Sequence, residues 1–439
     1  MPSNNDKLEA PKPSLKEQQK QNTVAKRQRK AKRKTKQIKY VEDTAYSQPS
    51  KLKTNVKKSF LYAKGGFDVP FFAAVLALLT IGLVMLFSAS YPSAYQKFDG
   101  DSFYYFKRQL VFAVAGVAVM IIMSKVNYKF IKVIEKPLFF ITIALLVLVL
   151  FYHVNLEDRS EDFKRWIPIG PITLQPSDIA KFTLVVTLAS YISKNRKYMQ
   201  RLTYGVLFPA LIVGLFCVLI YLENHLSCTV LMFFIGITLM FCGGTRWQWF
   251  VGGICLVAVV AVVVISNPDV LPGYQGDRIR AWTDKTFEPL GLRWQTNNSL
   301  YAIGSGGFFG VGLGNSKQKY LYVSEPQNDF IFSIVCEELG FFGATVIIAL
   351  FALLFVRGIK IAQRCEDKYA ALIVIGIVAQ VAIQTIFNIL VVTDTFPNTG
   401  IALPFFSYGG TALLMLCFEM GVVLSISRYV NTKKIEEKI

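Results

Sequence analysis

Histidine and charged residues are scarce in this sequence. Among its 439 residues there are two histidines and seven cysteines, and only 18% of the residues are charged. The two histidines lie far apart, which excludes a histidine–cysteine metal site. Every cysteine except Cys365 falls in an apolar run, which argues against a disulfide framework.

Apolar residues are abundant instead. They make up 53% of the chain, and the mean hydropathy is +0.41. This composition excludes an ordinary soluble protein and indicates a polytopic membrane protein. A helix needs about 20 apolar residues to cross a bilayer core of about 30 Å. We predict an all-α polytopic fold with ten transmembrane helices, at Pro70 to Tyr91, Leu110 to Asn127, Pro137 to Val154, Ile179 to Ser193, Leu202 to Leu222, Ser227 to Gly243, Trp247 to Ser266, Asp329 to Val356, Tyr369 to Val392 and Ile401 to Ser427.

Charge divides the chain into three parts. Residues 1–67 hold 18 Lys or Arg against 5 Asp or Glu, which accounts for most of the net charge of +19. We predict a disordered basic tail there, a membrane domain over 68–429 and a short tail over 430–439. A long polar segment with no cleavage-site pattern precedes the first span, so we predict a retained helix rather than a signal peptide.

The same charges predict the orientation. Lys and Arg are concentrated in cytoplasmic connectors of membrane proteins, so the basic tail is predicted to be cytoplasmic. The connectors SKVNYKFIKVIEK, SKNRKYMQR and VRGIKIAQRCEDK and the C-terminal RYVNTKK then lie on the cytoplasmic side, and each is rich in Lys or Arg. Both termini are therefore predicted to be cytoplasmic. The long connector 267–328, between helices seven and eight, is predicted to lie outside.

The KRQRKAKRKTK run of the tail allows two interpretations. A basic run beside a membrane binds anionic lipid, and a basic run alone does not exclude nucleic acid. The run contains no aromatic residue that would stack on bases. We therefore favour anionic lipid as its partner and expect no nucleic acid.

Polar and irregular residues gather in five segments, all predicted near the outer face. In the first, Arg165–Phe182, prolines and a glycine forbid regular helix before Ser177, which is predicted to cap a helix beginning at Asp178. Lys181 lies three residues beyond Asp178, either as a functional cation or as a snorkelling lysine paired with its neighbour. The second segment, YLENHLS, has too few ligands for a metal site and is predicted to be a solvated turn.

The third segment is the connector 267–328 itself, which is too long and too aromatic for a simple linker and is predicted to fold over the membrane face. Its glycine string, Gly304 to Gly314, lacks the preceding strand and the following Lys-Ser/Thr of a nucleotide loop, so no nucleotide is expected. Glycines there either form tight turns or let backbone N–H groups approach a lipid diphosphate. Arg278, Arg280 and Lys319 would supply cations to such a group.

The fourth segment, EPQNDFIFSIVCEELGFFG, places three carboxylates in an apolar run. Ionisable groups inside a span are functional candidates, because they are costly unless they face a cavity or a partner. Asp329 and Glu337 are eight residues apart, about 12 Å along a helix, so they cannot act as one carboxylate pair. We predict that Asp329 is a catalytic or metal-binding carboxylate at the outer mouth, and that Glu337 and Glu338 are structural.

The fifth segment, VVTDTFPNTGIALPFFSYGG, again interrupts an apolar run, near Asn388, Pro397, Pro404 and Ser407. Broken helix is tolerated at membrane depth only where it lines a cavity or is buried in protein. Five such segments on one side of the membrane therefore predict a site there.

These segments carry a resemblance to a known family. WIPIG, LQPSDIAK, IGSGGFFGVGLGNSKQK, EPQNDFIFSIVCEELGFFG and FPNTGIALPFFSYGG resemble, in order, the motifs of the FtsW/RodA/SpoVE (SEDS) family of cell-wall polymerases. The resemblance extends from about Phe71 to Tyr429. The SKQKY and EPQNDFIF runs are more similar to the FtsW/SpoVE branch than to RodA.

The resemblance implies a ten-helix peptidoglycan glycosyltransferase of the bacterial cytoplasmic membrane. Such an enzyme polymerises lipid II at the outer face, for cell division or a sporulation septum, together with a class B penicillin-binding protein and other divisome or elongasome membrane proteins. Asp329 would be the general base on the acceptor hydroxyl, with a divalent cation, Mg²⁺ or Mn²⁺, at the diphosphate. The residues predicted to bind substrate are Arg165, Trp166, Lys181, Arg278, Arg280, Gln295, Ser299, Lys319, Glu325 and Ser407, and those predicted to be structural are Asp178, Glu337, Glu338 and Asn388.

The sequence departs from the family pattern in three places. The family usually has Glu where Asp178 stands, and the shorter acid should keep its pairing with Lys181. A Gln/Glu-Pro-Asp-hydrophobic-Gly-Thr run is usual where this chain has Glu223 to Cys228. A Leu-Pro-Glu is usual at Val323 to Glu325, and the missing proline loosens the predicted approach to Asp329.

Two other functions fit the same features. Ten spans with intramembrane charges also describe a flippase for lipid-linked precursors. Polar groups that cluster on the outer side, and the lack of an evident inverted repeat, favour the enzyme. A non-catalytic divisome scaffold would keep the fold but would tolerate the loss of Asp329.

Overall fold

The computed structural model describes residues 65–436, except 152–164, 171, 268–269, 271–273 and 289. Nearly all of the predicted basic tail, the acidic connector NLEDRSEDFK and the last three residues lie outside the described residues. The described residues belong to one compact unit, which spans Leu61–Ile439.

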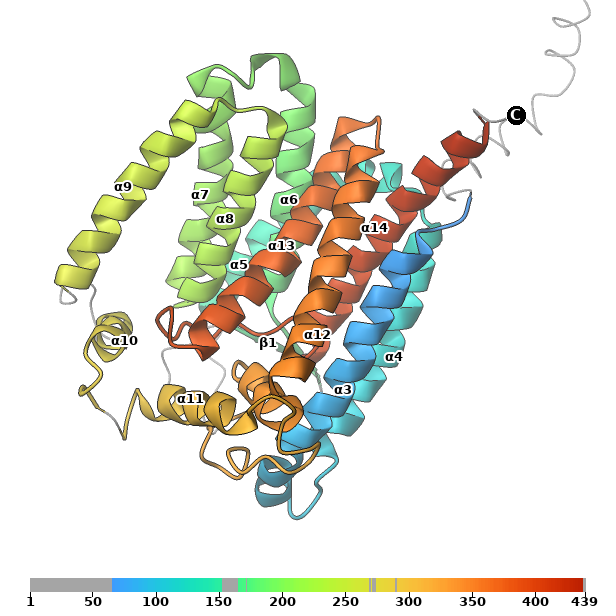
Figure 1. Cartoon of the computed structure of the whole chain (residues 1–439). Helices are drawn as coiled ribbons and strands as arrows, with labels where there is room; N and C mark the ends of the chain where they lie inside the picture. The colour runs from blue at the N-terminus through green and yellow to red at the C-terminus, as the bar shows by residue number, and fades with distance from the viewer. Residues whose placement is uncertain are drawn as a thin grey trace, which may run out of the picture. The chain divides into compact units, whose positions relative to one another are not determined.

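The described residues are almost entirely helical (Figure 1). A two-stranded antiparallel hairpin, β1 (Ile167–Ile169) and β2 (Ile172–Leu174), is the only sheet among them. The helices are α3 (Val69–Lys97), α4 (Tyr104–Lys125), α5 (Lys129–Phe151), α6 (Pro176–Lys194), α7 (Phe208–Leu222), α8 (Leu226–Gly243), α9 (Trp247–Ser266), α10 (Tyr274–Thr283), α11 (Trp294–Gly306), α12 (Ile331–Gln363), α13 (Lys368–Val392) and α14 (Gly410–Glu436).

Nine of the described helices are long and apolar enough to cross a membrane. They correspond to nine of the ten predicted spans, and α7 reaches this length together with the π-helical turn Thr203–Leu207 that precedes it. The remaining predicted span, Ile179 to Ser193, lies in α6, which is less apolar. Since α6 packs against α5, α8 and α13, its serines and threonines face protein rather than lipid. The chain is an all-α multi-pass membrane protein.

The last predicted span begins too early. It was predicted from Ile401, but α14 begins at Gly410. Residues 393–409 are irregular because the segment contains Pro397 and Pro404, and both Gly400 and Phe405 adopt positive φ, of 69° and 67°. Helices α10 and α11 likewise occupy the connector 267–328, which was predicted to fold without specified elements.

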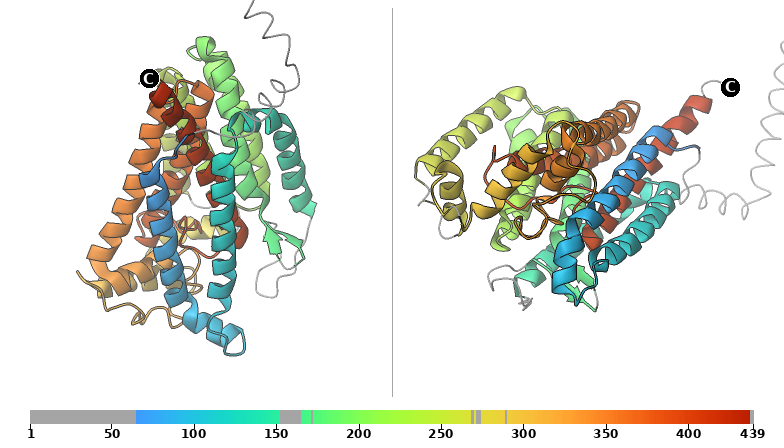
Figure 2. Two further views of the ribbon diagram at one scale, coloured as in Figure 1. Left: turned by 90° about the vertical axis from the view of Figure 1, so that its right-hand side faces the viewer. Right: turned by 60° about the horizontal axis from the view of Figure 1, so that its bottom comes forward.

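Helices α4 and α14 pack along one another beside α3 (Figures 1 and 2). Glycine allows this close approach, because a Cβ on Gly116 of α4 would lie 2.9 Å from the Sγ atom of Cys417 in α14.

Helix α9, unlike α4 and α14, is not packed into the bundle, since none of its most apolar stretch is buried. Trp247, Trp249, Val251 and Val259 are exposed on the surface that a bilayer would cover.

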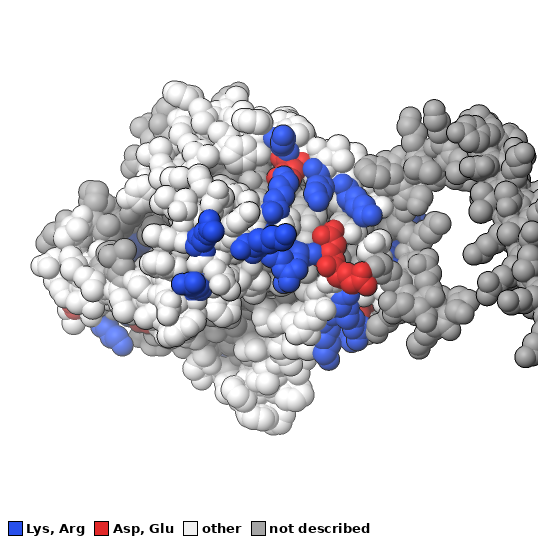
Figure 3. Space-filling view, turned by 90° about the horizontal axis from the view of Figure 1, so that it is seen from above, with Lys and Arg blue, Asp and Glu red and all other residues white. Residues whose placement is uncertain are grey.

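The two ends of the bundle differ in charge. Figure 3 shows Lys and Arg gathered on the end that is at the top of Figure 1. The connectors α6–α7 and α12–α13 lie at this end and contribute Arg196, Lys197, Arg201, Arg364 and Lys368. Helices α10 and α11 lie at the other end.

A buried polar network joins the glycine-rich connector to α12. The α12 backbone breaks at Gly340, with φ 65° and ψ −169°, so the carbonyls of Glu337 and Glu338 accept hydrogen bonds from Val311 N (2.9 Å) and Gly312 N (3.1 Å). A side chain at residue 310 would not fit, because a Cβ on Gly310 would lie 2.1 Å from Glu338 O. The glycine string thus packs directly on the start of α12.

The side chains of the same two glutamates are also engaged. The Glu337 carboxylate accepts hydrogen bonds from the Ser316 hydroxyl and from Lys317 N at 2.9 Å. The Glu338 carboxylate lies 2.9 Å from Lys319 Nζ and accepts from the Ser88 hydroxyl of α3 at 2.7 Å. Lys319, which was predicted to bind substrate, is 2% exposed and is held in this ion pair, so the structure gives it a structural position instead.

Replacing Lys319 with Met should leave Glu338 charged, buried and without its cation. Breaking a buried ion pair in this way costs about 3–5 kcal/mol, so we expect a large drop in the thermal midpoint of the purified protein in detergent. The double variant Lys319→Met/Glu338→Gln should recover most of the loss. Lys107→Met, which removes an exposed pair with Asp101, should cost about 0–1 kcal/mol. Equal shifts for Lys107→Met and Lys319→Met would contradict this assignment.

Candidate active site

A cavity of about 1210 Å³ is lined by the ends of α4, α6, α8 and α14 and by irregular residues before α12 and after α13. Residues from all five polar segments predicted from the sequence meet in it. The predicted site residues that line it are Arg165, Trp166, Asp178, Lys181, Arg278, Glu325, Asp329 and Ser407.

The β1–β2 hairpin leads into α6, which presents one ion pair to the cavity. Lys181 Nζ lies 2.8 Å from Asp178 Oδ1, and both side chains are largely buried. The predicted cap at Ser177 is wrong, since α6 begins at Pro176 with Gln175 at the capping position. Proline suits the first helical position because the missing N–H would have no partner there.

The turn between α7 and α8 is also part of the site, although a solvated turn was predicted. Glu223 is 0% exposed. Burial raises the pKa of Glu223 to about 8, and the nearby Arg165 guanidinium opposes this shift. Arg165 donates a hydrogen bond to the Asn224 carbonyl. Burial lowers the pKa of His225, and the positive charges of Arg165 and Lys181 lower it further, so the ring is neutral at physiological pH.

Asp329 lies two residues before α12, where two other segments hold its backbone. Asn388 Nδ2 donates to Asp329 O at 2.7 Å, and the Ser407 hydroxyl donates to Asn328 O at 2.8 Å. Gly400 contacts the carboxylate itself, since a Cβ on Gly400 would lie 3.0 Å from Asp329 Oδ2. The Asp329 backbone is therefore held in place, and its carboxylate lies beside backbone that only glycine allows to come so close.

Four predicted substrate-binding residues do not line this cavity. Ser299 is fully buried and donates to Val392 O at 2.9 Å, so it fastens α11 to α13. Gln295 lines a second, smaller pocket together with Arg278. Arg280 lines neither the cavity nor the smaller pocket, and Lys319 is held by Glu338. The sequence pattern identified the polar segments but not which side of each segment faces the cavity.

Two residues that the sequence prediction missed also line the cavity. Gln380 of α13 donates to Glu419 Oε2 of α14 at 2.9 Å, and both side chains are almost fully buried. Glu419 is an isolated acid within an apolar span, which is the signal that would have identified it.

The match to a family model decides where the chain belongs. The model described as cell cycle protein, FtsW/RodA/SpoVE, matches residues 69–432. The chain belongs to the FtsW/RodA/SpoVE family. The resemblance found in the motifs is thereby confirmed.

Relatives in the FtsW/RodA/SpoVE family match nearly the whole membrane domain. Stage V sporulation protein E of Bacillus subtilis (strain 168) is 42% identical over 357 residues, which cover 81% of this chain and 95% of that protein. A protein of Trichlorobacter lovleyi named probable peptidoglycan glycosyltransferase FtsW is 35% identical over 373 residues, which cover 85% of this chain and 95% of that protein.

Solved structures share the fold of this family member. A chain from a structure described as "Structural coordination of polymerization and crosslinking by a peptidoglycan synthase complex" has a TM-score of 0.68 at 24% identity, and the match covers 83% of this chain and 98% of that chain. RodA of Thermus thermophilus has a TM-score of 0.59 at 23% identity, with 82% and 97% covered. These likenesses confirm the predicted all-α membrane fold.

The raised pKa of Glu223 predicts a pH-dependent stability. The unfolded pKa is about 4.3. Between that value and about 8 the folded state binds more protons than the unfolded state. The stabilisation from this group is thus complete at low pH and is lost as the pH rises toward 8. In thermal melts of the purified protein, Glu223→Gln should gain stability relative to wild type as the pH is raised from about 5 to about 8. A constant difference between the two proteins across that range would contradict the raised pKa.

Proposed function

We propose that this chain is a peptidoglycan glycosyltransferase that polymerises lipid II into glycan strands at the outer face of the cytoplasmic membrane. The observation that carries the proposal is Asp329, a carboxylate fixed in the wall of a large cavity that is also lined by Arg165, Lys181 and Arg278. The names of the relatives support the same reaction class.

In this reaction Asp329 accepts the proton of the acceptor sugar hydroxyl. The hydroxyl oxygen bonds to the anomeric carbon of the donor sugar, and the bond from that carbon to the lipid diphosphate breaks. A base held within hydrogen-bond reach contributes about 10²–10⁴-fold to the rate. Asn388 holds the Asp329 backbone in place before substrate arrives, and the Gly400 backbone lies beside the carboxylate.

The basic residues of the cavity act on the leaving group. Negative charge builds on the diphosphate as the bond to the sugar breaks, and cations placed in advance stabilise this charge. Arg165 and Arg278 suit the role because a guanidinium can donate two parallel hydrogen bonds to phosphate oxygens. Lys181 is fixed by Asp178, so it offers a positioned point charge.

A divalent cation fits this site only with the help of the substrate. The described residues contain no group of three His, Cys, Asp or Glu side chains that could hold a metal. Mg²⁺ is commonly bound through one or two carboxylates, with substrate phosphates and water completing its shell. Asp329 would supply that carboxylate, and the ion would neutralise charge on the diphosphate.

We propose that both termini are cytoplasmic and that the cavity end faces outward, and the basic end of the bundle supports this orientation. We propose a class B penicillin-binding protein as the partner, on the model of the similar chain from a peptidoglycan synthase complex. Similarity to a sporulation protein and to FtsW favours a role in a division or sporulation septum.

A flippase for lipid-linked precursors is the second candidate, and one observation favours it. Glu419 lies nine residues into α14, about 14 Å along the helix axis. The cavity therefore reaches polar groups well inside the bundle, as a transport path does.

Asp329→Asn should abolish glycan synthesis from labelled lipid II by the purified protein with its cognate transpeptidase. The amide keeps the shape of the side chain but cannot accept the proton at neutral pH. Asp284→Asn, at an exposed position outside the cavity, should retain wild-type synthesis. If the cation is required, a chelator should reduce glycan synthesis by wild type and by Asp284→Asn. Equal product from Asp329→Asn and wild type, with a transpeptidase unable to polymerise, would remove Asp329 from the mechanism. No product from either protein would return weight to the flippase.

A further inference from the structure

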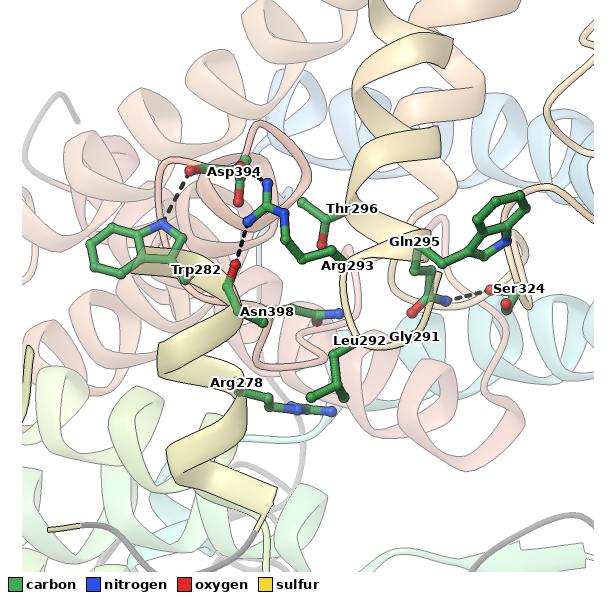
Figure 4. Close-up of a pocket in the computed structure, with 12 residues that line it drawn as sticks. Arg278, Trp282, Gly291, Leu292, Arg293, Gln295, Thr296, Ser324, Asp394 and Asn398 are labelled. Carbon is green, nitrogen blue, oxygen red and sulfur yellow. Dashed lines mark hydrogen bonds and ion pairs between the residues drawn. The ribbon is translucent and has the colours of Figure 1, made fainter. Parts of the chain in front are cut away.

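A second hollow, of about 230 Å³, lies beside the large cavity (Figure 4). Three parts of the chain enclose it: α10 with Arg278 and Trp282, the start of α11 with its preceding turn, and the segment after α13 that carries Asp394 and Asn398. It is smaller than the roughly 300–1,000 Å³ of pockets for drug-sized ligands, so it has room for about one sugar ring.

A buried guanidinium fixes the shape of this hollow. Arg293 is 3% exposed and donates to the Ala281 carbonyl of α10 and, at 2.8 Å, to Asp394 Oδ2. Trp282 Nε1 donates to the Asp394 carbonyl at 3.1 Å. The three enclosing parts are thereby tied to one another, and the hollow is formed before a ligand arrives.

The chemistry of the lining suits a sugar. Asp394 pairs with Arg293, and Arg278 adds a second guanidinium on the side shared with the cavity. The other polar lining groups are neutral, those of Asn398, Thr296 and Gln295, and Trp282 adds an indole ring. Arg293 Nε is buried and has no hydrogen-bond partner within the described residues. Directional donors with an aromatic wall match the hydroxyl and carbonyl oxygens and the apolar faces of a pyranose.

The hollow and the cavity share their walls. Arg278 lines both. Ser324 lines the hollow and Glu325 the cavity, and in the same way Asn398 lines the hollow and Thr399 the cavity. The hollow therefore adjoins the cavity that Asp329 lines.

We propose that this hollow is a saccharide subsite that holds one N-acetylated sugar of the growing glycan strand, next to the sugar that reacts at Asp329. The inference rests on the proposed polymerase function. A strand held there stays with the protein between additions, so the subsite sets how many sugars are added before release.

Direct binding tests the subsite without any need for turnover. The probe is a soluble, uncrosslinked oligomer of alternating N-acetylglucosamine and N-acetylmuramic acid, added to the full-length protein in detergent. Asn398→Ala and Gln295→Ala should each weaken binding by about 10-fold, as expected for the loss of roughly 1.4 kcal/mol of polar contacts. Asn315→Ala makes the same kind of change at an exposed site outside both hollows and should bind as wild type does. Thermal melts establish that all variants are folded.

Strand length is the second readout. With labelled lipid II and the transpeptidase partner, the mean strand length from the two subsite variants should fall by a larger factor than the rate of lipid II consumption. Unchanged oligomer binding and unchanged strand length would overturn the subsite while leaving the polymerase intact. No glycan from wild type would overturn the polymerase instead, and the binding experiment would still decide whether the hollow takes a sugar.

Discussion

The site depends on hydrogen bonds that satisfy irregular backbone within a bundle of apolar helices. Asn388 of α13 donates to two carbonyls, Asp329 O at 2.7 Å and Ile401 O at 2.6 Å. Gln384, one helical turn earlier, donates to Ala402 O at 2.8 Å. At such depth, backbone N–H and C=O groups outside a helix have no water as a hydrogen-bond partner. The side-chain amides of Asn388 and Gln384 therefore allow the two non-helical segments that contain Asp329 and Ile401 to exist there. The position of Asp329 follows from that arrangement.

Buried ion pairs serve different roles in different parts of the molecule. Lys319 with Glu338 forms a pair that lines neither the cavity nor the smaller hollow, and Arg293 with Asp394 forms a pair that lines the hollow. Both pairs fasten the connector 267–328 onto the bundle. Lys181 and Asp178 form a similar pair, but it lines the cavity. Whether a charged residue belongs to the framework or to a site thus depends on whether it lines a cavity, and not on its charge.

This distinction explains how far the sequence alone could go. Apolar run lengths and breaks at proline and glycine predicted the spans and the polar segments, because each is a local property. Contacts between residues far apart in the sequence are not a local property. Lys319 was therefore predicted to bind substrate, although it forms an ion pair with Glu338. Ser299 was likewise predicted to bind substrate, although its hydroxyl donates to Val392 O. Glu419 was missed although its isolation in an apolar helix marked it, and the YLENHLS turn was predicted to be solvated because its polarity was taken as a sign of exposure.

The YLENHLS turn also has a consequence for charge in the cavity. An ionised Glu223 would neutralise Arg165, which lines the same cavity and donates to the neighbouring Asn224 carbonyl. Burial instead raises the pKa of Glu223 to about 8, so the acid is largely neutral at physiological pH. His225, whose pKa is lowered by burial and by the positive charges of Arg165 and Lys181, adds no charge of its own. The turn therefore adds little negative charge beside Arg165, and Lys181 in the same cavity wall is paired with Asp178. In the proposed reaction, the cations of the wall would stabilise the departing diphosphate beside Asp329, the carboxylate that must stay basic.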